Sequence, residues 1–395
     1  MRIAYVCADR GVPVFGRKGS SNHVQEVVRS LVARHARVEI FAARIGGLPP
    51  PGLDAVAVHR LPKGPRDTPE QKERSALDSN SRLRDTLDSR GPFDLVYERH
   101  SLWSYAGMEY ARDHFVPGLL EVNAPLILEQ RRYRKLVLED EANLAVAKAF
   151  GAASALLGVS EGVAGYLRGH SAVTAPVYVV PNGVDPRRFM PPSRDRSPDG
   201  SRPFRVGFVG MLKPWHAVDD LVEAFSGLRR QCGNTQLLIV GDGPQRHILE
   251  TKVSACGAHD AVDFHGAVAP AEVPPLLASM DVAVVPYAPT EGFYFSPLKL
   301  FEYMAAGRAI VAARIGQMET FVVDGVTGLL YPPGDVASLT SALVRLAEDE
   351  PLRRRLGAAA REVAIRDHTW HAVIGRIFEL AKAHAPTRLP AGSAN

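Results

Sequence analysis

The sequence predicts an α/β protein built from two doubly wound, Rossmann-like domains. Apolar runs of strand length alternate with helix-length segments along the chain. The strand segments are apolar on both faces, as expected for a parallel sheet that helices cover on both sides. A polar, proline-rich segment interrupts this alternation near the middle, after which it restarts. Two such domains imply a cleft between them, and ligands of these sheets bind at the carboxyl ends of the strands.

The first domain is predicted over residues 1–185. A helix is expected over Asn22–Arg34, where Val24, Val27, Val28 and Leu31 recur with helical spacing. Residues 60–92 are polar and are expected to form a surface excursion containing a helix. Its strands are expected at Arg2–Cys7, Val38–Ala42, Leu95–Tyr97, Gly118–Val122, Ala155–Val159 and Val177–Val180.

The second domain is predicted over residues 204–368, after a linker at 186–203 that is rich in Pro, Ser, Arg and Asp. Trp370 opens a final helix, predicted over 369–385 to cross back to the first domain, and residues 386–395 are expected to be a disordered tail. The strands are expected at Arg205–Val209, Gln236–Val240, Val262–His265, Val282–Pro286, Ala309–Ala312 and Gly328–Tyr331.

Composition narrows the class of protein. A formal net charge of +4 over 395 residues does not indicate nucleic acid as a partner, which requires a concentrated basic surface. Three scattered cysteines do not indicate a disulfide framework, and a reducing cytoplasm is the expected location. The N-terminus does not read as a signal peptide, and no stretch approaches the ~20 apolar residues of a membrane span.

Several cofactor motifs are missing or incomplete. The segment from Gly11 to Lys18 resembles a phosphate-binding Walker A loop but lacks its Gly-Lys-Ser/Thr ending, and the first strand is not followed by Gly-x-Gly-x-x-Gly. The sequence contains no Asp-x-Asp and no Cys/His cluster with metal-ligand spacing. We therefore expect no metal site and no bound cofactor.

The most informative segment runs from Glu291 to Gly307. Ser296 is expected to be the N-cap of a helix and Pro297 its first residue, followed by Leu298, with Gly307 ending the helix. Lys299 then lies in the first turn, where a cation opposes the helix dipole unless an anion is bound there.

Glu302 follows Lys299 on the same helix face. A cation and then a carboxylate fit a diphosphate followed by a ribose, with Lys299 on phosphate and Glu302 on the ribose hydroxyls. The alternative is an exposed ion pair between these two residues. Other predicted strand ends of the second domain favour the ligand site: Lys213 follows Gly210, a tight turn begins at Gly241, and His265 precedes Gly266.

The chain resembles glycosyltransferase family 4, whose members have the GT-B fold and retain the anomeric configuration of the sugar. The resemblance is carried by segments in the family's order along nearly the whole chain. They are Gly16–His23, Gly158–Ser160, Val180–Asp185 with Phe189, Gly207–Gly210, Val240–Pro244, Glu302–Gly307 and Asp324–Gly328.

This resemblance implies roles for several residues. Glu302 would bind ribose, Gly16 and Gly19 would let the N-terminal loop approach the donor phosphate, and the backbone after His265-Gly266 would meet the nucleobase. Asn182 and Gly183 would lie at the interdomain hinge. The segment Gly316–Thr320 would lie near the diphosphate.

The chain departs from the family pattern at three places. Tyr294 stands where the first Glu of Glu-x₇-Glu is usual, with Glu291 three residues early. Met211 and His216 stand where the usual phosphate-binding Arg and Lys fall, so Lys213 and Lys299 are expected to replace them. Asn123 loosely matches the usual His of the first domain, and His100 is a second candidate.

We therefore predict a retaining glycosyltransferase that moves a hexosyl-type sugar from a nucleoside-diphosphate sugar, with UDP favoured, to a hydroxyl acceptor of a natural product, glycan or lipid-linked sugar. Alternatives are a non-catalytic nucleotide-sugar-binding subunit and a sugar-nucleotide isomerase. The predicted catalytic residues are Lys213, Lys299, His100 and Asn123, and the predicted sugar-donor site comprises Gly16, Gly19, Gly210, Gly241, His265, Gly266, Glu291, Tyr294, Ser296, Pro297, Leu298 and Glu302.

Three further residues or segments keep two interpretations each. His23 faces the cleft or lies on a helix surface, and Asn123 satisfies a strand end or acts in catalysis. The basic run Arg131–Lys135 is a solvated face or contacts an anionic acceptor or membrane surface.

Overall fold

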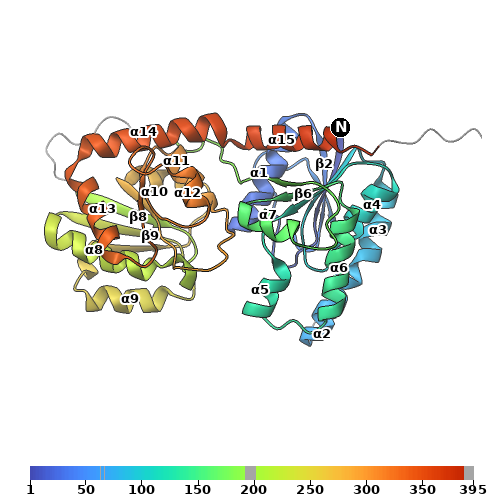
Figure 1. Cartoon of the computed structure of the whole chain (residues 1–395), viewed down its shortest axis with the longest axis horizontal. Helices are drawn as coiled ribbons and strands as arrows, with labels where there is room; N and C mark the ends of the chain where they lie inside the picture. Colours follow the sequence, from blue (N-terminus) through green and yellow to red (C-terminus); the bar gives the residue numbers. More distant parts are fainter. Residues whose placement is uncertain (63, 66, 192–201, 387–395) are drawn as a thin grey trace, which may run out of the picture. The chain divides into compact units, whose positions relative to one another are not determined.

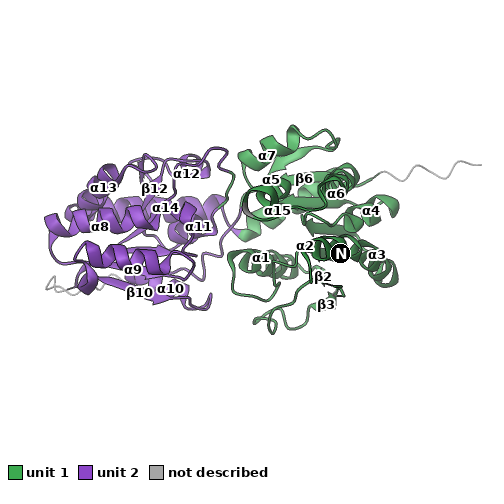
Figure 2. Cartoon of the chain, turned by 90° about the horizontal axis from the view of Figure 1, so that it is seen from below, with its two compact units in different colours: residues 1–181, 294–296, 370–395 green, residues 182–293, 297–369 purple. Residues whose placement is uncertain are grey.

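The computed structural model describes residues 1–62, 64–65, 67–191 and 202–386. Figure 2 shows the two compact units of the chain. Unit 1 comprises Met1–Pro181, Tyr294–Ser296 and Trp370–Asn395, and unit 2 comprises Asn182–Phe293 and Pro297–Thr369. Each unit is built around its own parallel sheet, which confirms the predicted fold class.

Unit 1 contains a seven-stranded sheet in the order β3-β2-β1-β4-β5-β6-β7, with every neighbouring pair parallel. Strand order reverses next to β1, so the carboxyl ends of β1 and β4 flank the point where such sheets bind ligands. The strands are β1 (Arg2–Cys7), β2 (Arg37–Ala42), β3 (Ala57–Arg60), β4 (Leu95–Arg99), β5 (Gly118–Val122), β6 (Ala155–Gly158) and β7 (Val177–Val179).

The helices of unit 1 pack on both faces of this sheet (Figure 1). The final helix begins at Trp370, as predicted, and belongs to this unit. The helices are α1 (Gly19–Ala33), α2 (Pro69–Leu77), α3 (Ser79–Arg90), α4 (Ala106–Asp113), α5 (Leu126–Tyr133), α6 (Glu139–Ala152), α7 (Glu161–Arg168) and α15 (Trp370–Ala383).

Residues 60–92 differ from the prediction of a surface excursion with one helix. They form two helices, and α3 buries Leu83 and Leu87 in the core of unit 1. The helix α2 begins at a capping box, in which the Thr68 hydroxyl accepts from the amide of Gln71. The strand β3, which precedes this region, was not predicted because it is a four-residue edge strand with exposed ends.

Unit 2 contains a six-stranded parallel sheet in the order β10-β9-β8-β11-β12-β13. Here the order reverses next to β8. The elements are β8 (Phe204–Val209), η1 (Pro214–His216), α8 (Val218–Cys232), β9 (Thr235–Val240), α9 (Arg246–Ala255), η2 (His259–Ala261), β10 (Val262–Gly266), α10 (Val273–Ser279), β11 (Val282–Val285), α11 (Leu298–Ala305), β12 (Ala309–Ala313), α12 (Gln317–Phe321), β13 (Leu329–Tyr331), α13 (Val336–Glu348) and α14 (Glu350–Asp367).

The predicted linker and tail lie partly outside the described residues, at 192–201 and 387–395. The beginning of the predicted linker is packed into unit 2. Phe189 is buried there, and the guanidinium of Arg188 donates to the carbonyl of Pro270. Unit 2 begins at Asn182, whereas the sequence predicts a second domain that starts at residue 204, after the linker.

Candidate functional site

Three glycines close the carboxyl ends of β8, β9 and β10 in unit 2. The Gly241 amide donates to the carbonyl of Gly266 at 2.8 Å, and the Gly210 amide donates to the carbonyl of Val240. Gly210, Gly241 and Gly266 all have positive φ, at 154°, 139° and 82°. A Cβ at Gly241 would overlap the carbonyl oxygen of Gly210, so these turns lie backbone against backbone.

The helix α11 is attached to the end of β8 by a tyrosine. The hydroxyl of the fully buried Tyr303 accepts from the Val209 amide at 2.7 Å. The helix begins at Leu298 with Pro297 as its N-cap, so the prediction of Ser296 as N-cap and Pro297 as first residue is wrong by one position. Pro297 has an extended ψ of 116°, which excludes it from the helix itself. Lys299 is then the second residue of α11.

The amine of Lys299 is buried against aromatic rings in unit 2. Its Nζ lies 4.3 Å from the centre of the Phe208 ring and 5.7 Å from that of Tyr287. A Cβ at Gly210 would lie 2.8 Å from this nitrogen, so the glycine leaves space for the amine. Among the described residues, Nζ has no hydrogen-bond partner, and the alternative of an exposed ion pair with Glu302 is wrong. Burial lowers the pKa of Lys299 to about 7, an effect that the nearby Glu302 opposes.

His216 lies beside this amine and near a second lysine. Its Nδ1 is 2.6 Å from the Met211 carbonyl, which only accepts, so Nδ1 carries the proton and donates. Burial lowers the pKa of His216 to about 3, and the charges of Lys299 and Lys213 add to that shift. His216 is therefore neutral near pH 7. The Nζ of Lys213 lies 5.6 Å from the ring centre of Trp215.

The remaining predicted side chains of unit 2 differ in their exposure. Glu302 is half-buried one turn after Lys299 on α11, whereas Glu291 is exposed in the loop that follows β11. His265 is exposed at the end of β10, with its Nδ1 3.9 Å from Asp263. The structure thus brings together Gly210, Lys299 and His216, with the aromatic rings of Phe208 and Tyr287 as residues that the sequence reasoning missed.

Tyr294 and Ser296 belong to unit 1, unlike the helix that follows them. The Tyr294 hydroxyl donates to the carboxylate of Glu129, and its ring packs against the hydrophobic core of unit 1. The Ser160 hydroxyl donates to the Tyr294 carbonyl at 2.6 Å. The residue that replaces the family's first Glu is therefore an attachment point within unit 1.

Unit 1 has its own polar cluster, centred on the buried carboxylate of Glu121 in β5. Its Oε1 lies 2.7 Å from His23 Nε2 and 3.2 Å from Arg99 Nη1, and Oε2 accepts from the Tyr97 hydroxyl at 2.5 Å. Burial alone would raise the pKa of Glu121, but His23, Arg99 and Tyr97 together lower it to about 2. The sequence reasoning missed this carboxylate, although a Glu within an otherwise apolar strand was the signal that could have found it.

The predicted catalytic residues of unit 1 lie around this cluster. The amide of Asn123 donates to Glu121 Oε1 at 2.6 Å, which matches the interpretation of Asn123 as satisfying a strand end. His23 is buried and meets the edge of Trp370, so its interpretation as a helix-surface residue is wrong. His100 is buried against Phe150, and burial, with Arg99 and His170, lowers its pKa to about 3.

The two predicted glycines of the N-terminal loop, Gly16 and Gly19, differ in the space around them. A Cβ at Gly16 would clash with Pro13 and lie 2.8 Å from the Ser21 hydroxyl, so packing within unit 1 is sufficient to require glycine there. Gly19 is the first residue of α1, and a Cβ at that position would meet no atom within 4 Å. Of these two glycines, Gly19 is therefore the one with open space around its Cα.

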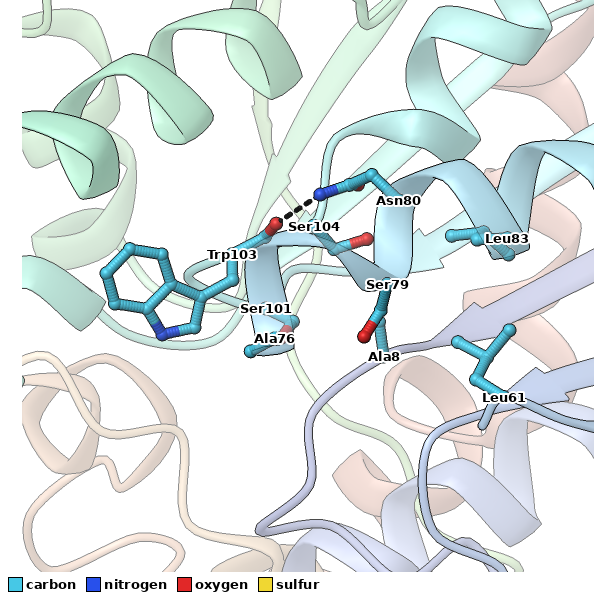
Figure 3. A pocket seen from close by; sticks show the side chains of 9 residues that line it. All are labelled: Ala8, Leu61, Ala76, Ser79, Asn80, Leu83, Ser101, Trp103 and Ser104. Atoms are coloured by element: carbon cyan, nitrogen blue, oxygen red, sulfur yellow. Dashed lines mark hydrogen bonds between the residues drawn. The ribbon is translucent and has the colours of Figure 1, made fainter. Parts of the chain in front are cut away.

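A small pocket opens in unit 1 next to the ends of β1 and β3 (Figure 3). The volume that a water molecule can occupy in this pocket is about 10 Å³. This is room for one water molecule and far too little for a sugar. The Asn80 amide donates to the Trp103 carbonyl at 2.8 Å beside it. Its lining residues are Ala8, Leu61, Ala76, Ser79, Asn80, Leu83, Ser101, Trp103 and Ser104.

The basic run Arg131–Lys135 lies at the end of α5, and the side chains of Arg131, Arg132, Arg134 and Lys135 are exposed. Arg131 pairs with Glu139 of the following helix, whose first turn also holds Asp140 and Glu141. Within the described parts of the chain, no helix is both long and apolar enough to span a bilayer. Over the same residues, no group of three His, Cys, Asp or Glu is placed to hold a metal ion.

Comparison with known proteins identifies the family. Residues 17–188 match the family described as Glycosyltransferase Family 4, and residues 203–349 match Glycosyl transferases group 1. A D-inositol 3-phosphate glycosyltransferase from Stackebrandtia nassauensis is 29% identical, over 96% of this chain and 91% of the relative.

Solved structures with the same fold span almost the whole chain. Sucrose-phosphate synthase from Thermosynechococcus elongatus has a TM-score of 0.76 at 20% identity, covering 97% of this chain and 98% of that one. HepE from Anabaena in complex with UDP-glucose has a TM-score of 0.72 at 20% identity, covering 97% and 100%. These structures show the GT-B fold, and the two family matches show that the chain belongs to glycosyltransferase family 4 and is a glycosyltransferase.

Proposed function

We propose that the protein transfers a hexosyl-type sugar from a nucleoside-diphosphate sugar to a hydroxyl acceptor with retention of anomeric configuration. The observation that carries the proposal is the buried amine of Lys299, which lies without a hydrogen-bond partner at the carboxyl end of β8, among the described residues. A buried amine without a counter-ion is costly to the fold unless a ligand compensates it. The diphosphate of a sugar donor is such a ligand.

The sugar donor would be held by groups from several strand ends of unit 2. Lys299 and Lys213 would hold the diphosphate, and the carboxylate of Glu302 would accept hydrogen bonds from the ribose hydroxyls. The backbone after Gly266 would meet the nucleobase. The positive φ angles of Gly210, Gly241 and Gly266 support this arrangement, because backbone without Cβ atoms lets a ligand approach closely.

The proposed reaction takes place on one face of the sugar through an oxocarbenium-like transition state. The bond from the anomeric carbon to the diphosphate breaks, the acceptor oxygen bonds to the same face, and the departing diphosphate takes the acceptor's proton. The negative charge on the leaving group grows in the transition state. Lys299 and Lys213 would stabilise that charge, which other enzymes stabilise with a divalent metal ion.

UDP is the favoured nucleotide, and HepE, a neighbour in fold, was crystallised with UDP-glucose. The D-inositol 3-phosphate glycosyltransferases supply a precedent for a hydroxyl acceptor, because their name places the sugar on a polyol phosphate. The acceptor of this protein is proposed only as a hydroxyl compound.

The test is a thermal-shift series of the full chain with UDP, GDP, TDP and ADP, followed by measurement of turnover with the matching nucleotide sugar. We expect one diphosphate to raise Tm most, in a concentration-dependent manner. Lys299→Met should remove most of that shift. Lys252→Met should keep it, because Lys252 is an ion-paired lysine on α9 with its Nζ 3.0 Å from Glu223. If none of the four diphosphates raises Tm, the proposed sugar-donor site is wrong.

A further inference from the structure

The surroundings of Lys299 have a consequence for how the diphosphate binds. We propose that Lys299 is an uncharged amine in the free protein and takes up one proton when the diphosphate of the sugar donor binds, so that ligand and proton bind together. This inference rests on the proposed function, because it assigns the diphosphate to the same amine.

The first support is that, among the described residues, no hydrogen-bond acceptor stabilises a charge on Nζ. In the described parts of the chain, Nζ accepts and donates no hydrogen bond and is shielded from solvent. The rings of Phe208 and Tyr287 attract a cation, but this attraction is small beside the cost of desolvating an ammonium ion.

The second support is the position of Lys299 in its helix. Lys299 is the second residue of α11, so a charge on it would also face the positive end of the helix dipole. The first turn of α11 holds no acidic residue. A neutral amine avoids this repulsion. A bound diphosphate would instead attract both a charged amine and the positive end of the helix.

The other titratable groups around the amine do not alter this balance. His216, from the turn after β8, is neutral near pH 7, and Tyr287, after β11, has a pKa raised by burial. The charge of Lys213 also lowers the pKa of His216. On α11 itself, Glu302 favours a charge on Lys299, while Tyr303 is held against the backbone of Val209.

Burial against these groups lowers the pKa of Lys299 to about 7 in the free protein, in agreement with the geometry. A diphosphate in contact with Nζ restores an ammonium ion, because an opposite charge at hydrogen-bond distance favours the charged form. The proton comes from solvent and forms an N–H bond on Nζ. It returns to solvent when the diphosphate leaves.

The experiment is isothermal titration of the full chain with UDP at pH 8, in two buffers with different ionisation enthalpies. At this pH the phosphates of UDP are already ionised, so the ligand itself takes up no proton. We expect close to one proton to be taken up per UDP bound. We also expect the affinity to fall about tenfold for each pH unit above 8, because binding then competes with loss of the proton.

Two variants isolate the group that takes up the proton. In Lys299→Met the proton uptake should disappear and the weaker affinity should no longer depend on pH. In Lys299→Arg, whose guanidinium is always charged, any UDP that binds should bind without proton uptake. The matched control Lys252→Met should behave as the wild type.

The outcomes separate this inference from the proposed function. Binding of UDP without proton uptake, or proton uptake that persists in Lys299→Met, overturns the inference but leaves the sugar-donor site standing. Failure of UDP and of the other three diphosphates to bind overturns both.

Discussion

The two units each bury an ionisable side chain near the carboxyl ends of their strands, but the surroundings of the two side chains have opposite effects. In unit 1 the carboxylate of Glu121 meets His23, Arg99, Tyr97 and Asn123. In unit 2 the amine of Lys299 meets two aromatic rings and, within the described residues, no hydrogen-bond partner. The first group is fully compensated by the fold, whereas the second is left for a ligand to compensate.

This difference also shows in the direction of the two pKa shifts. The partners of Glu121 lower its pKa to about 2, which stabilises its charged form. Burial lowers the pKa of Lys299 to about 7, which stabilises its neutral form. Glu121 and Lys299 are both buried ionisable residues. They differ in whether their surroundings favour the charged form.

The largest expected effect is on the stability of unit 1. Glu121→Gln should lower the free energy of unfolding by about 3–5 kcal/mol, because it leaves the largely buried Arg99 without the carboxylate that it contacts. Urea denaturation measures this change. The matched control is Glu161→Gln, which breaks the exposed pair between Glu161 and Arg168 and should cost about 1 kcal/mol or less.

The pH dependence of the same variant sharpens the comparison. The folded pKa of Glu121 lies below the unfolded one, so its contribution is present above about pH 4.5 and is lost as pH falls toward about 2. The difference between wild type and Glu121→Gln should shrink over that window. A difference that stays constant down to pH 2 would mean that the charge of Glu121 does not stabilise the fold.

The second prediction is a loss of turnover without a loss of stability. Lys299→Met keeps the apolar stem of the side chain and removes only the amine, so it should slow release of UDP from UDP-glucose roughly 100-fold. The free variant should be as stable as the wild type or more so. Enzyme kinetics and thermal unfolding of the same preparation test both statements together.

The pH dependence of stability provides a second test for Lys299. Its folded pKa of about 7 lies below the ordinary value of 10.5, so the unfolded chain binds more protons between these values. The stability of the wild type relative to Lys299→Met should therefore rise with pH across that window. A variant that is destabilised yet fully active would rule out the phosphate role of Lys299.

A smaller effect is expected for a substitution of Glu302, whose carboxylate is only half-buried. Glu302→Gln should weaken nucleotide binding by ~1.5–3 kcal/mol, because a neutral amide accepts weaker hydrogen bonds from a ribose than a carboxylate does. Isothermal titration with UDP measures the change. Unchanged affinity in a folded variant would contradict the ribose role.

The smallest expected effect is the effect of metal removal on turnover. If lysine side chains stabilise the leaving diphosphate, turnover in excess EDTA should equal that of the untreated enzyme. The assay is UDP release from UDP-glucose with and without chelator. Complete loss of turnover that Mg²⁺ or Mn²⁺ restores would show that the account based on Lys213 and Lys299 is wrong.

Much of the fold could be predicted because parallel strands buried on both faces have a strong apolar signal. Strands β1 and β5 begin and end at the predicted residues. The edge strand β3 escaped prediction because Ala57 and Arg60 are exposed and the strand is only four residues long. The sequence predicts a surface location for α3 because Leu83 and Leu87 are the only apolar residues of that helix.

The candidate site could be predicted only in part. Lys299 was found because a cation in a first helical turn conflicts with the helix dipole, which is a local signal. The burial of its amine depends on Phe208 in β8 and on Tyr287 after β11, and neither residue carries a local signal of that role. Tyr294 and Glu129 are 165 residues apart in the sequence, so no pattern in either segment could reveal their hydrogen bond.

The attachment of Tyr294 to Glu129 and Ser160 has a consequence for how this enzyme could be recombined with its relatives. A hybrid that joins unit 1 of one relative to residues 182–369 of this chain would bring Tyr294, Phe295 and Ser296 into a foreign unit 1. A parent lacking a carboxylate at position 129 and a hydroxyl at position 160 would offer them no partners. Chimeric enzymes of this kind therefore require these three residues to be exchanged together with unit 1, although they lie within the gene segment that encodes unit 2.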